Sequence, residues 1–349
     1  MPCMSFLHDD MVLFSHTHVY DIIVISKNTV TSDQEDVLAK EYRVVHTWGE
    51  ADRQTCVSSL ECIGGSQILI SRKNGMVEIV DVCGDCRRVW EKDAGGEVVS
   101  AHALEESGGV VSVLREDGVG RVYTVGDESH VGEFRCPPKV TCSAHDGGSG
   151  RLAVGCQGAE LKVYDMLDES RSVVFAGKGG KPNAVGLCDR PWNSAVAFNH
   201  GRDDGSHIVV GTGYGNVRLY DTRVGRRPQL DVPFKGYRIT CIAPERCGNR
   251  WWVGDASGNL QVYDVRAGTY HGAIKGIGGS VRSLDIHPKE PLIASVGLDR
   301  FVRVNSLQSS RSCVVRMYAT SQLTAVGFLE HKKEKDKEGD QIPKRRRKK

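Results

Sequence analysis

The sequence predicts an all-β fold built from one structural unit that recurs about every forty residues. Two observations lead to this prediction. Six strand-like segments follow one another at intervals of 43, 41, 56, 43 and 42 residues. The composition agrees, because the chain has 40 glycines and only 7% aromatic residues, which fits frequent turns better than long helices.

The recurring segment has the alternation of a β-strand with one buried face. Its second and fourth residues are mostly apolar, and its third is polar or charged. Four of the six copies carry tyrosine one residue before the end, where a ring can pack on a neighbouring unit. The copies differ in the third residue and in the loop that follows, so we expect function there. They are MVEIVD ending at Asp81, VGRVYT at Thr124, ELKVYD at Asp165, NVRLYD at Asp221, NLQVYD at Asp264 and FVRVNS at Ser306.

Each unit contains more than this one strand. Turn residues such as Asn74-Gly75 and Asp117-Gly118 precede the segment, and a second strand pattern such as RITCIA opens the unit. Several short antiparallel strands of this kind cannot bury both faces alone, so neighbouring units must stack around an axis. The sequence therefore predicts a β-propeller.

The two ends of the chain predict how the ring closes. LTAVGF, residues 323–328, has the form of a first strand without the rest of its unit, and MVLF and VYDIIVI near the N-terminus look like later strands without a first one. We therefore expect residues 1–330 to form a seven-bladed propeller whose seventh blade combines N- and C-terminal strands. Deletion of residues 318–330 should then abolish cooperative folding.

Residues 331–349 form a basic tail that we expect to be disordered. They hold ten Lys/Arg against four Asp/Glu, whereas the rest of the chain has an acidic excess of four. The tail has no apolar periodicity and ends in six basic residues, Lys344, Arg345, Arg346, Arg347, Lys348 and Lys349. Such a run predicts a nuclear or nucleolar address and a sequence-independent contact with RNA phosphates; a merely solubilising tail is the alternative.

The repeat resembles that of WD-repeat β-propellers, with Tyr-Asp in place of the usual Trp-Asp ending and with the Gly-His pair largely absent. Residues 177–330, including GTGYGNVRLYDTRVGRRPQLD and GSVRSLDIHPKEPLIASVGLDRFVRV, are similar to the nucleolar WD-repeat factors that join early precursors of the large ribosomal subunit. That resemblance implies a non-enzymatic docking module in the nucleolus or nucleus, monomeric within a larger complex. The implied partners are pre-60S proteins and rRNA, an AAA-type ATPase that releases the factor, and an RNA helicase with the exosome.

Three groups of residues are candidates for partner or RNA contacts. Arg223, Arg226 and Arg227 follow a strand end directly. Arg282 and Arg300 match motif positions of the resembling factors, although Arg300 could equally be a turn residue paired with Asp299. The long interval before Asp221 contains an insertion, residues 177–193, with Lys181 and Trp192; it is either a docking loop or a tolerated surface loop.

Catalytic, metal and cofactor sites are not predicted. Cys83 and Cys86 form a C-x-x-C without a second pair of ligands, and His8, His16 and His18 lack a carboxylate or cysteine partner nearby. GKGGKPN, residues 177–183, lacks the spacing and the Ser/Thr of a phosphate loop, and residues 211–215 lead into a strand where a dinucleotide fingerprint needs a helix. No Ser/His/Asp motif occurs in an elbow context.

Other function classes are less well supported. No apolar run approaches the length of roughly 20 residues that a membrane helix needs, so we expect no membrane partner. One alternative is a WD-repeat adaptor of another nuclear complex, such as a substrate receptor for ubiquitin ligation. Another is a propeller hydrolase, which charged residues converging on the central channel would favour.

Overall fold

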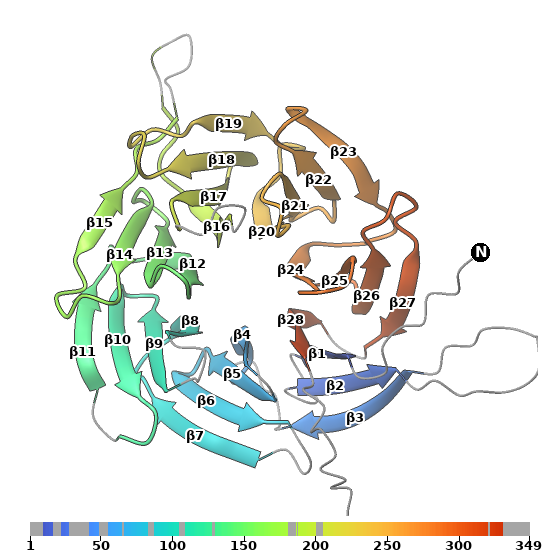
Figure 1. Ribbon diagram of the computed structural model, residues 1–349, viewed down its shortest axis with the longest axis horizontal. Coiled ribbons are helices and arrows are strands. Elements are labelled where there is room, and N and C mark those ends of the chain that lie inside the picture. Colours follow the sequence, from blue (N-terminus) through green and yellow to red (C-terminus); the bar gives the residue numbers. More distant parts are fainter. Residues whose placement is uncertain are drawn as a thin grey trace, which may run out of the picture.

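The fold is a ring of antiparallel sheets around a central axis, as the computed structural model in Figure 1 shows. Residues described with their side chains are 55–64, 66–82, 87–104, 109–127, 130–180, 186, 188–199, 205–319 and 322–329. Residues 10–16, 22–27, 42–48 and 330 are described as strand backbone only. Every regular element in these ranges is a β-strand.

The first three blades come from the N-terminal half of the ring. Each has four strands, the first nearest the axis and the fourth outermost (Figure 1). Blade 1 contains β4 Val57–Ile63, β5 Gln67–Arg72, β6 Met76–Asp81 and β7 Arg87–Asp93. Blade 2 contains β8 Val98–Ala103, β9 Val110–Arg115, β10 Val119–Thr124 and β11 His130–Arg135. Blade 3 contains β12 Val140–Asp146, β13 Arg151–Cys156, β14 Lys162–Asp165 and β15 Val173–Ala176.

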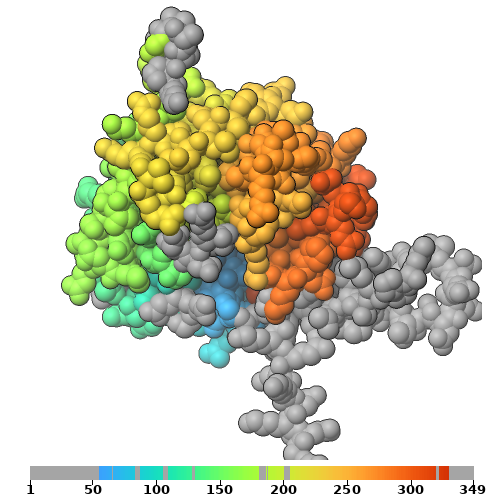
Figure 2. Space-filling model, turned by 45° about the horizontal axis from the view of Figure 1, so that its top comes forward, coloured from blue at the N-terminus to red at the C-terminus, as the bar shows by residue number. Residues whose placement is uncertain are grey.

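The next three blades continue in the same order, and Figure 2 shows blades 4 and 5, in yellow and orange, packed against each other. Blade 4 contains β16 Asn193–Phe198, β17 His207–Thr212, β18 Asn216–Asp221 and β19 Leu230–Pro233. Blade 5 contains β20 Ile239–Pro244, β21 Arg250–Asp255, β22 Leu260–Asp264 and β23 Thr269–Ile274. Blade 6 contains β24 Val281–Ile286, β25 Leu292–Gly297, β26 Phe301–Ser306 and β27 Cys313–Tyr318.

A further four-stranded sheet, which we call the closing sheet, joins the two ends of the chain. It has the order β28 Leu323–Glu330, β1 Asp10–His16, β2 Ile22–Lys27 and β3 Tyr42–Trp48, and Val12 of β1 pairs with Phe328 of β28. The predicted all-β propeller is thus confirmed. Six blades are described with their side chains, whereas the closing sheet is described by its strand pairing, so a stable seven-bladed ring stays a prediction. The basic tail lies outside the described residues.

The tyrosine of the repeat holds neighbouring blades together. Tyr164 and Tyr220 are buried in corresponding strands, and each reaches the blade before its own. The hydroxyl of Tyr164 donates to the carbonyl oxygen of Arg135 (3.2 Å), and that of Tyr220 donates to the carbonyl oxygen of Lys178 (3.0 Å). Burying the ring while its hydroxyl finds an acceptor is favourable, which explains the residue's recurrence. The repeated Tyr-Asp ending is therefore structural.

The polar third residue of the repeat is also structural in three blades. Glu78 is buried, and both the Nε and a terminal nitrogen of Arg72 donate to it. Arg303 bonds Asp299 at 2.6 Å, and both side chains are over nine-tenths buried. Arg218 Nε lies 3.0 Å from Asp231 Oδ2. Because a buried charge is costly without a partner, these pairs fix which side chains share a sheet face.

The described part of the chain offers no helix with the length and apolar character that a transmembrane span needs.

Candidate interaction surface at the channel mouth

The inner strands of all blades open into one cavity at the end of the axis where these strands begin. It has a volume of about 520 Å³, and we call it the channel mouth. Its charged lining residues come from the turns and the links between blades, and its small polar ones from the inner strands. The lining is Cys56, Val57, Ser58, Lys73, Glu97, Val98, Val99, Glu116, Val140, Thr141, Cys142, Ser194, Arg238, Thr240, Arg282, Leu298, Gln322, Leu323 and Thr324.

A β-bulge at the second residue of the inner strand recurs in all six blades described with side chains. In β24, for example, Val281 pairs with Gly297 and Ser283 with Val296, so that Arg282 is left out of the ladder. A bulge bends the strand and re-aims the extra side chain, here into the cavity. The second residues are Ser58, Val99, Thr141, Ser194, Thr240 and Arg282.

Arg282 is the exception among these six residues. The other blades use a small hydroxyl residue or valine at the bulge, so the fold itself does not require a long cation there. Arg282 is exposed, and no described residue forms an ion pair or a hydrogen bond with its guanidinium. Its charge is therefore directed at the solvent of the cavity.

Arg238 provides a second cation at the mouth, and an aromatic side chain holds it in place. Its guanidinium carbon lies 5.6 Å from the centre of the Trp192 ring, within the range of a cation–π contact. The Trp192 ring covers Gly213, where a Cβ would clash with it, and it meets the Tyr214 ring edge-on at 5.8 Å. Trp192 is thus a half-buried plate under Arg238, whose guanidinium has no ion pair with any described residue.

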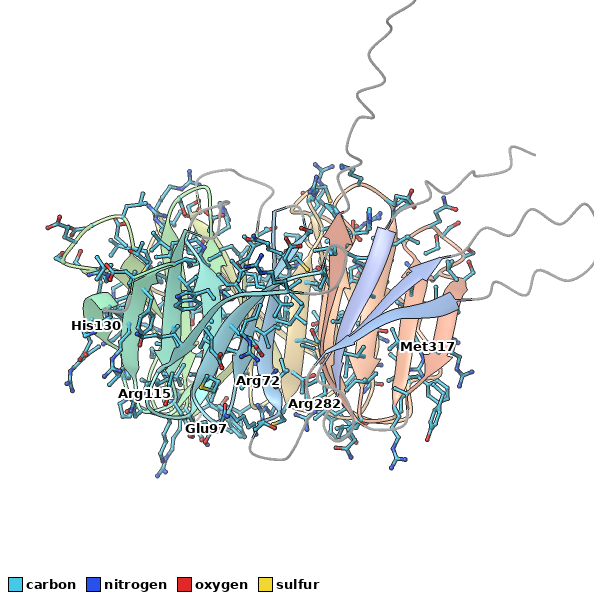
Figure 3. All side chains as sticks on the ribbon, turned by 90° about the horizontal axis from the view of Figure 1, so that it is seen from below. Arg72, Glu97, Arg115, His130, Arg282 and Met317 are labelled. Atoms are coloured by element: carbon cyan, nitrogen blue, oxygen red, sulfur yellow. The ribbon has the colours of Figure 1, made fainter. Side chains whose placement is uncertain are left out.

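The opposite side of the mouth carries acidic residues. Glu97 precedes the inner strand of blade 2, and Glu116 lies in the turn between β9 and β10 of the same blade. Figure 3 shows Glu97 and Arg282 at the same end of the ring. Lys73, in blade 1, adds a cation beside the acidic side. The mouth therefore has a basic side on blades 5 and 6 and a more acidic side on blade 2.

Further along the channel, a chain of hydrogen bonds crosses three inner strands. Glu61 Oε2 of β4 lies 2.8 Å from His102 Nδ1 of β8, and His102 Nε2 lies 2.8 Å from Ser143 Oγ of β12. Ser143 also shares a hydrogen bond with Ser100. This is the order of a serine-hydrolase triad, but Ser143 lies within a strand and not on a sharp turn. We interpret the chain as a link between blades.

Two titratable groups in this region have strongly shifted pKa values. Burial, reinforced by the charge of His102, lowers the pKa of His145 to about 4, so its imidazole is neutral at pH 7. Burial raises the pKa of Asp285 to about 6, although the backbone N–H of Phe328 donates to its Oδ2 at 2.7 Å and opposes the shift. The latter contact joins β24 to β28. Among the described residues, no group of three His, Cys, Asp or Glu is placed to hold a metal ion.

The structure separates the arginines predicted from the sequence into two places. Arg282 lines the mouth, and Arg300 lies in the turn after β25, where its Nη1 donates to the Tyr318 hydroxyl at 3.4 Å. Asp299 pairs with Arg303 and not with Arg300, so the turn-pair alternative for Arg300 is wrong.

The other predicted arginines lie in the loop between β18 and β19, away from the cavity. Arg223 Nε donates to Asp221 Oδ1 at 3.2 Å, and Arg226 Nε donates to the carbonyl oxygen of Ala176 in blade 3 at 2.6 Å. The pKa of Asp221 is lowered, with the Arg223 side chain as the main cause. Arg227 is exposed in the same loop. The three residues thus form part of the junction between blades 3 and 4.

Several predicted positions lie outside the described residues. They are Lys181 in the insertion, the basic residues 344–349, Cys83 and Cys86, and the side chains of His8, His16 and His18. Sequence reasoning also missed Arg238. Its position directly before an inner strand, equivalent to that of Trp192 one blade earlier, is the signal that could have found it.

The ring of four-stranded blades, with Tyr-Asp ending the third strand in blades 3, 4 and 5, defines a WD-repeat β-propeller. The chain is 30% identical to WD repeat-containing protein 74 of Bos taurus over 287 residues, which cover 80% of this chain and 73% of the bovine protein. It is 32% identical to the human protein of that name over 238 residues, 66% of this chain and 60% of the human protein. The chain belongs to the WD repeat-containing protein 74 family.

A yeast protein is also similar. Ribosome biogenesis protein nsa1 of Schizosaccharomyces pombe is 25% identical over 313 residues, which cover 81% of this chain and 79% of the yeast protein. No family model matches the chain. The matched region thus extends well beyond the second half, where the sequence motifs are most specific.

Proposed function

We propose that this protein is a non-enzymatic docking factor in ribosome biogenesis, acting in the nucleolus or nucleus on precursors of the large subunit (pre-60S). The observation that carries the proposal is its membership of the WD repeat-containing protein 74 family, together with similarity to a protein named for ribosome biogenesis. The mouth supports a docking role, because it presents unpaired charges on a rigid ring. The proposed partners are pre-60S proteins and rRNA.

The proposed mechanism uses both ends of the ring. Leu323 and Thr324, at the start of β28, line the mouth, and Glu330 ends the same strand. Eight residues of strand place Glu330 about 23 Å from Leu323, towards the other end of the channel. The basic tail follows Glu330, and we infer that it contacts rRNA phosphates there while the mouth engages protein. Release by an AAA-type ATPase, and action beside an RNA helicase and the exosome, belong to the same proposal.

One observation favours a different function. The Ser143, His102 and Glu61 side chains are within hydrogen-bond distance of one another in the order that a hydrolase uses. Labelling of Ser143 by a fluorophosphonate probe, abolished in His102→Ala, would favour the hydrolase. An unlabelled Ser143 would favour the docking factor.

Gradient sedimentation of the tagged chain tests the proposed function. We expect the full chain to sediment with particles that contain large-subunit precursor rRNA. A chain ending at Glu330 should leave those particles more readily as salt is raised, because it has lost six consecutive cations. Sedimentation only with small complexes, outside the nucleolus, would contradict the proposal and favour the adaptor alternative.

A further inference from the structure

We propose that the channel mouth is a receptor for an acidic segment of a partner protein, with Arg238 and Arg282 binding its carboxylates. The inference rests on the proposed docking function and gives that function a defined surface and a class of partner. It also separates the protein contact at the mouth from the RNA contact that we assign to the tail.

The internal repeat supplies the first argument. Six inner strands carry the same bulge, and at five of them a small side chain fills the place that Arg282 takes in blade 6. The blades fold without arginine there, so a structural requirement does not account for it. An arginine that is exposed, without an ion pair among the described residues, and aimed into a cavity is placed to bind an anion from outside.

The second argument is that Arg238 is preorganised. Trp192 lies under its guanidinium, Gly213 lies under Trp192, and Tyr214 closes the ring edge. A side chain already held in place loses less conformational entropy on binding. Tyr214 and Tyr237 are 44% and 54% exposed in turns beside this cluster, and they add aromatic area of the kind found at binding hot spots.

Charge complementarity selects protein over RNA as the occupant. Glu97 and Glu116 line the same cavity, and an RNA strand would bring repeated phosphates against them. A protein segment can place an acidic residue on the arginines and a neutral or basic residue at the glutamates. The chain's own tail fits poorly, because it is basic and it follows the end of β28 that is distant from the mouth.

Zero-length cross-linking tests this inference. Arg238→Lys and Arg282→Lys keep the charge and introduce an amine, which a water-soluble carbodiimide couples only to a carboxylate in direct contact. The tagged variants are purified with their bound complexes, cross-linked, digested and analysed by mass spectrometry. Arg246→Lys and Arg266→Lys, on exposed turns away from the mouth, are the matched controls.

We expect peptides that carry the introduced amine at position 238 or 282 to be joined to Asp or Glu of another protein, at least tenfold more abundantly than peptides from the control positions. Charge reversal in Arg238→Glu/Arg282→Glu should then release that protein at least fivefold, without a change in thermal unfolding, and reversal of the identified acidic residue to Lys should restore binding. Cross-links confined to this chain, no cross-links, or ultraviolet cross-links of Tyr237 to nucleotides would overturn the inference.

The outcome separates this inference from the proposed function. Sedimentation with large-subunit precursors but no carboxylate cross-link would leave the proposed function standing and remove the receptor role of the mouth. A carboxylate cross-link to a protein of an unrelated complex would do the reverse.

Discussion

A chain that ends at Met317 will lose its cooperative unfolding transition, whereas a chain that ends at Glu330 will keep it. The shorter chain lacks β28, which packs against blades 6 and 1 and pairs with β1. Leu323, Val326, Phe328 and Leu329 of this strand are all buried. Each contributes about 1.5–3 kcal/mol by its burial, so their loss is comparable with the whole stability of about 5–15 kcal/mol of a typical domain.

Scanning calorimetry and circular dichroism of both chains measure this effect. The chain ending at Glu330 is the matched control, because it loses only the tail. An unchanged melting transition for the chain ending at Met317 would show that six blades are sufficient, and it would contradict closure of the ring by β28.

The second large effect concerns Glu78. Replacing Glu78 by Ala should destabilise the protein by about 3–5 kcal/mol, because Arg72 would remain buried without its carboxylate. Arg72 Nε donates to Glu78 at 2.9 Å, and the two side chains are only 9% and 3% exposed. Arg88, from the neighbouring strand, lies 3.0 Å from the other carboxylate oxygen of Glu78. The loss therefore affects three strands of blade 1.

Urea unfolding of Glu78→Ala beside Glu91→Ala measures this contribution. Glu91 pairs with the same Arg88 on the surface, where an ion pair stabilises by at most about 1 kcal/mol. Equal, small effects of the two substitutions would show that the buried pair does not stabilise the blade.

The strands of the repeat could be predicted from the sequence almost to the residue. The segments expected to end at Asp81 and Asp221 are β6 and β18, because period-two alternation is a local property. The burial of the polar third residue was not foreseen. Glu78 is buried because Arg72, on the adjacent strand, neutralises it, and such pairing depends on register, which the alternation does not specify.

The site was predicted in part for the same reason. Arg282 was identified from its motif, but its direction into the cavity comes from a bulge that only strand pairing reveals. Arg238 was missed because its significance depends on Trp192, which lies one blade earlier in the chain. Arg223 and Arg226 form bonds within the protein, and their contacts with a partner stay a prediction.

The ratio of free large to small ribosomal subunits after depletion of this protein tests the central claim most directly. We predict that the ratio falls at least twofold in cells that normally express the protein, and that the full chain restores it. The chain carrying Arg238→Glu/Arg282→Glu should restore it poorly. An unchanged ratio after complete depletion would contradict a role in maturation of the large subunit.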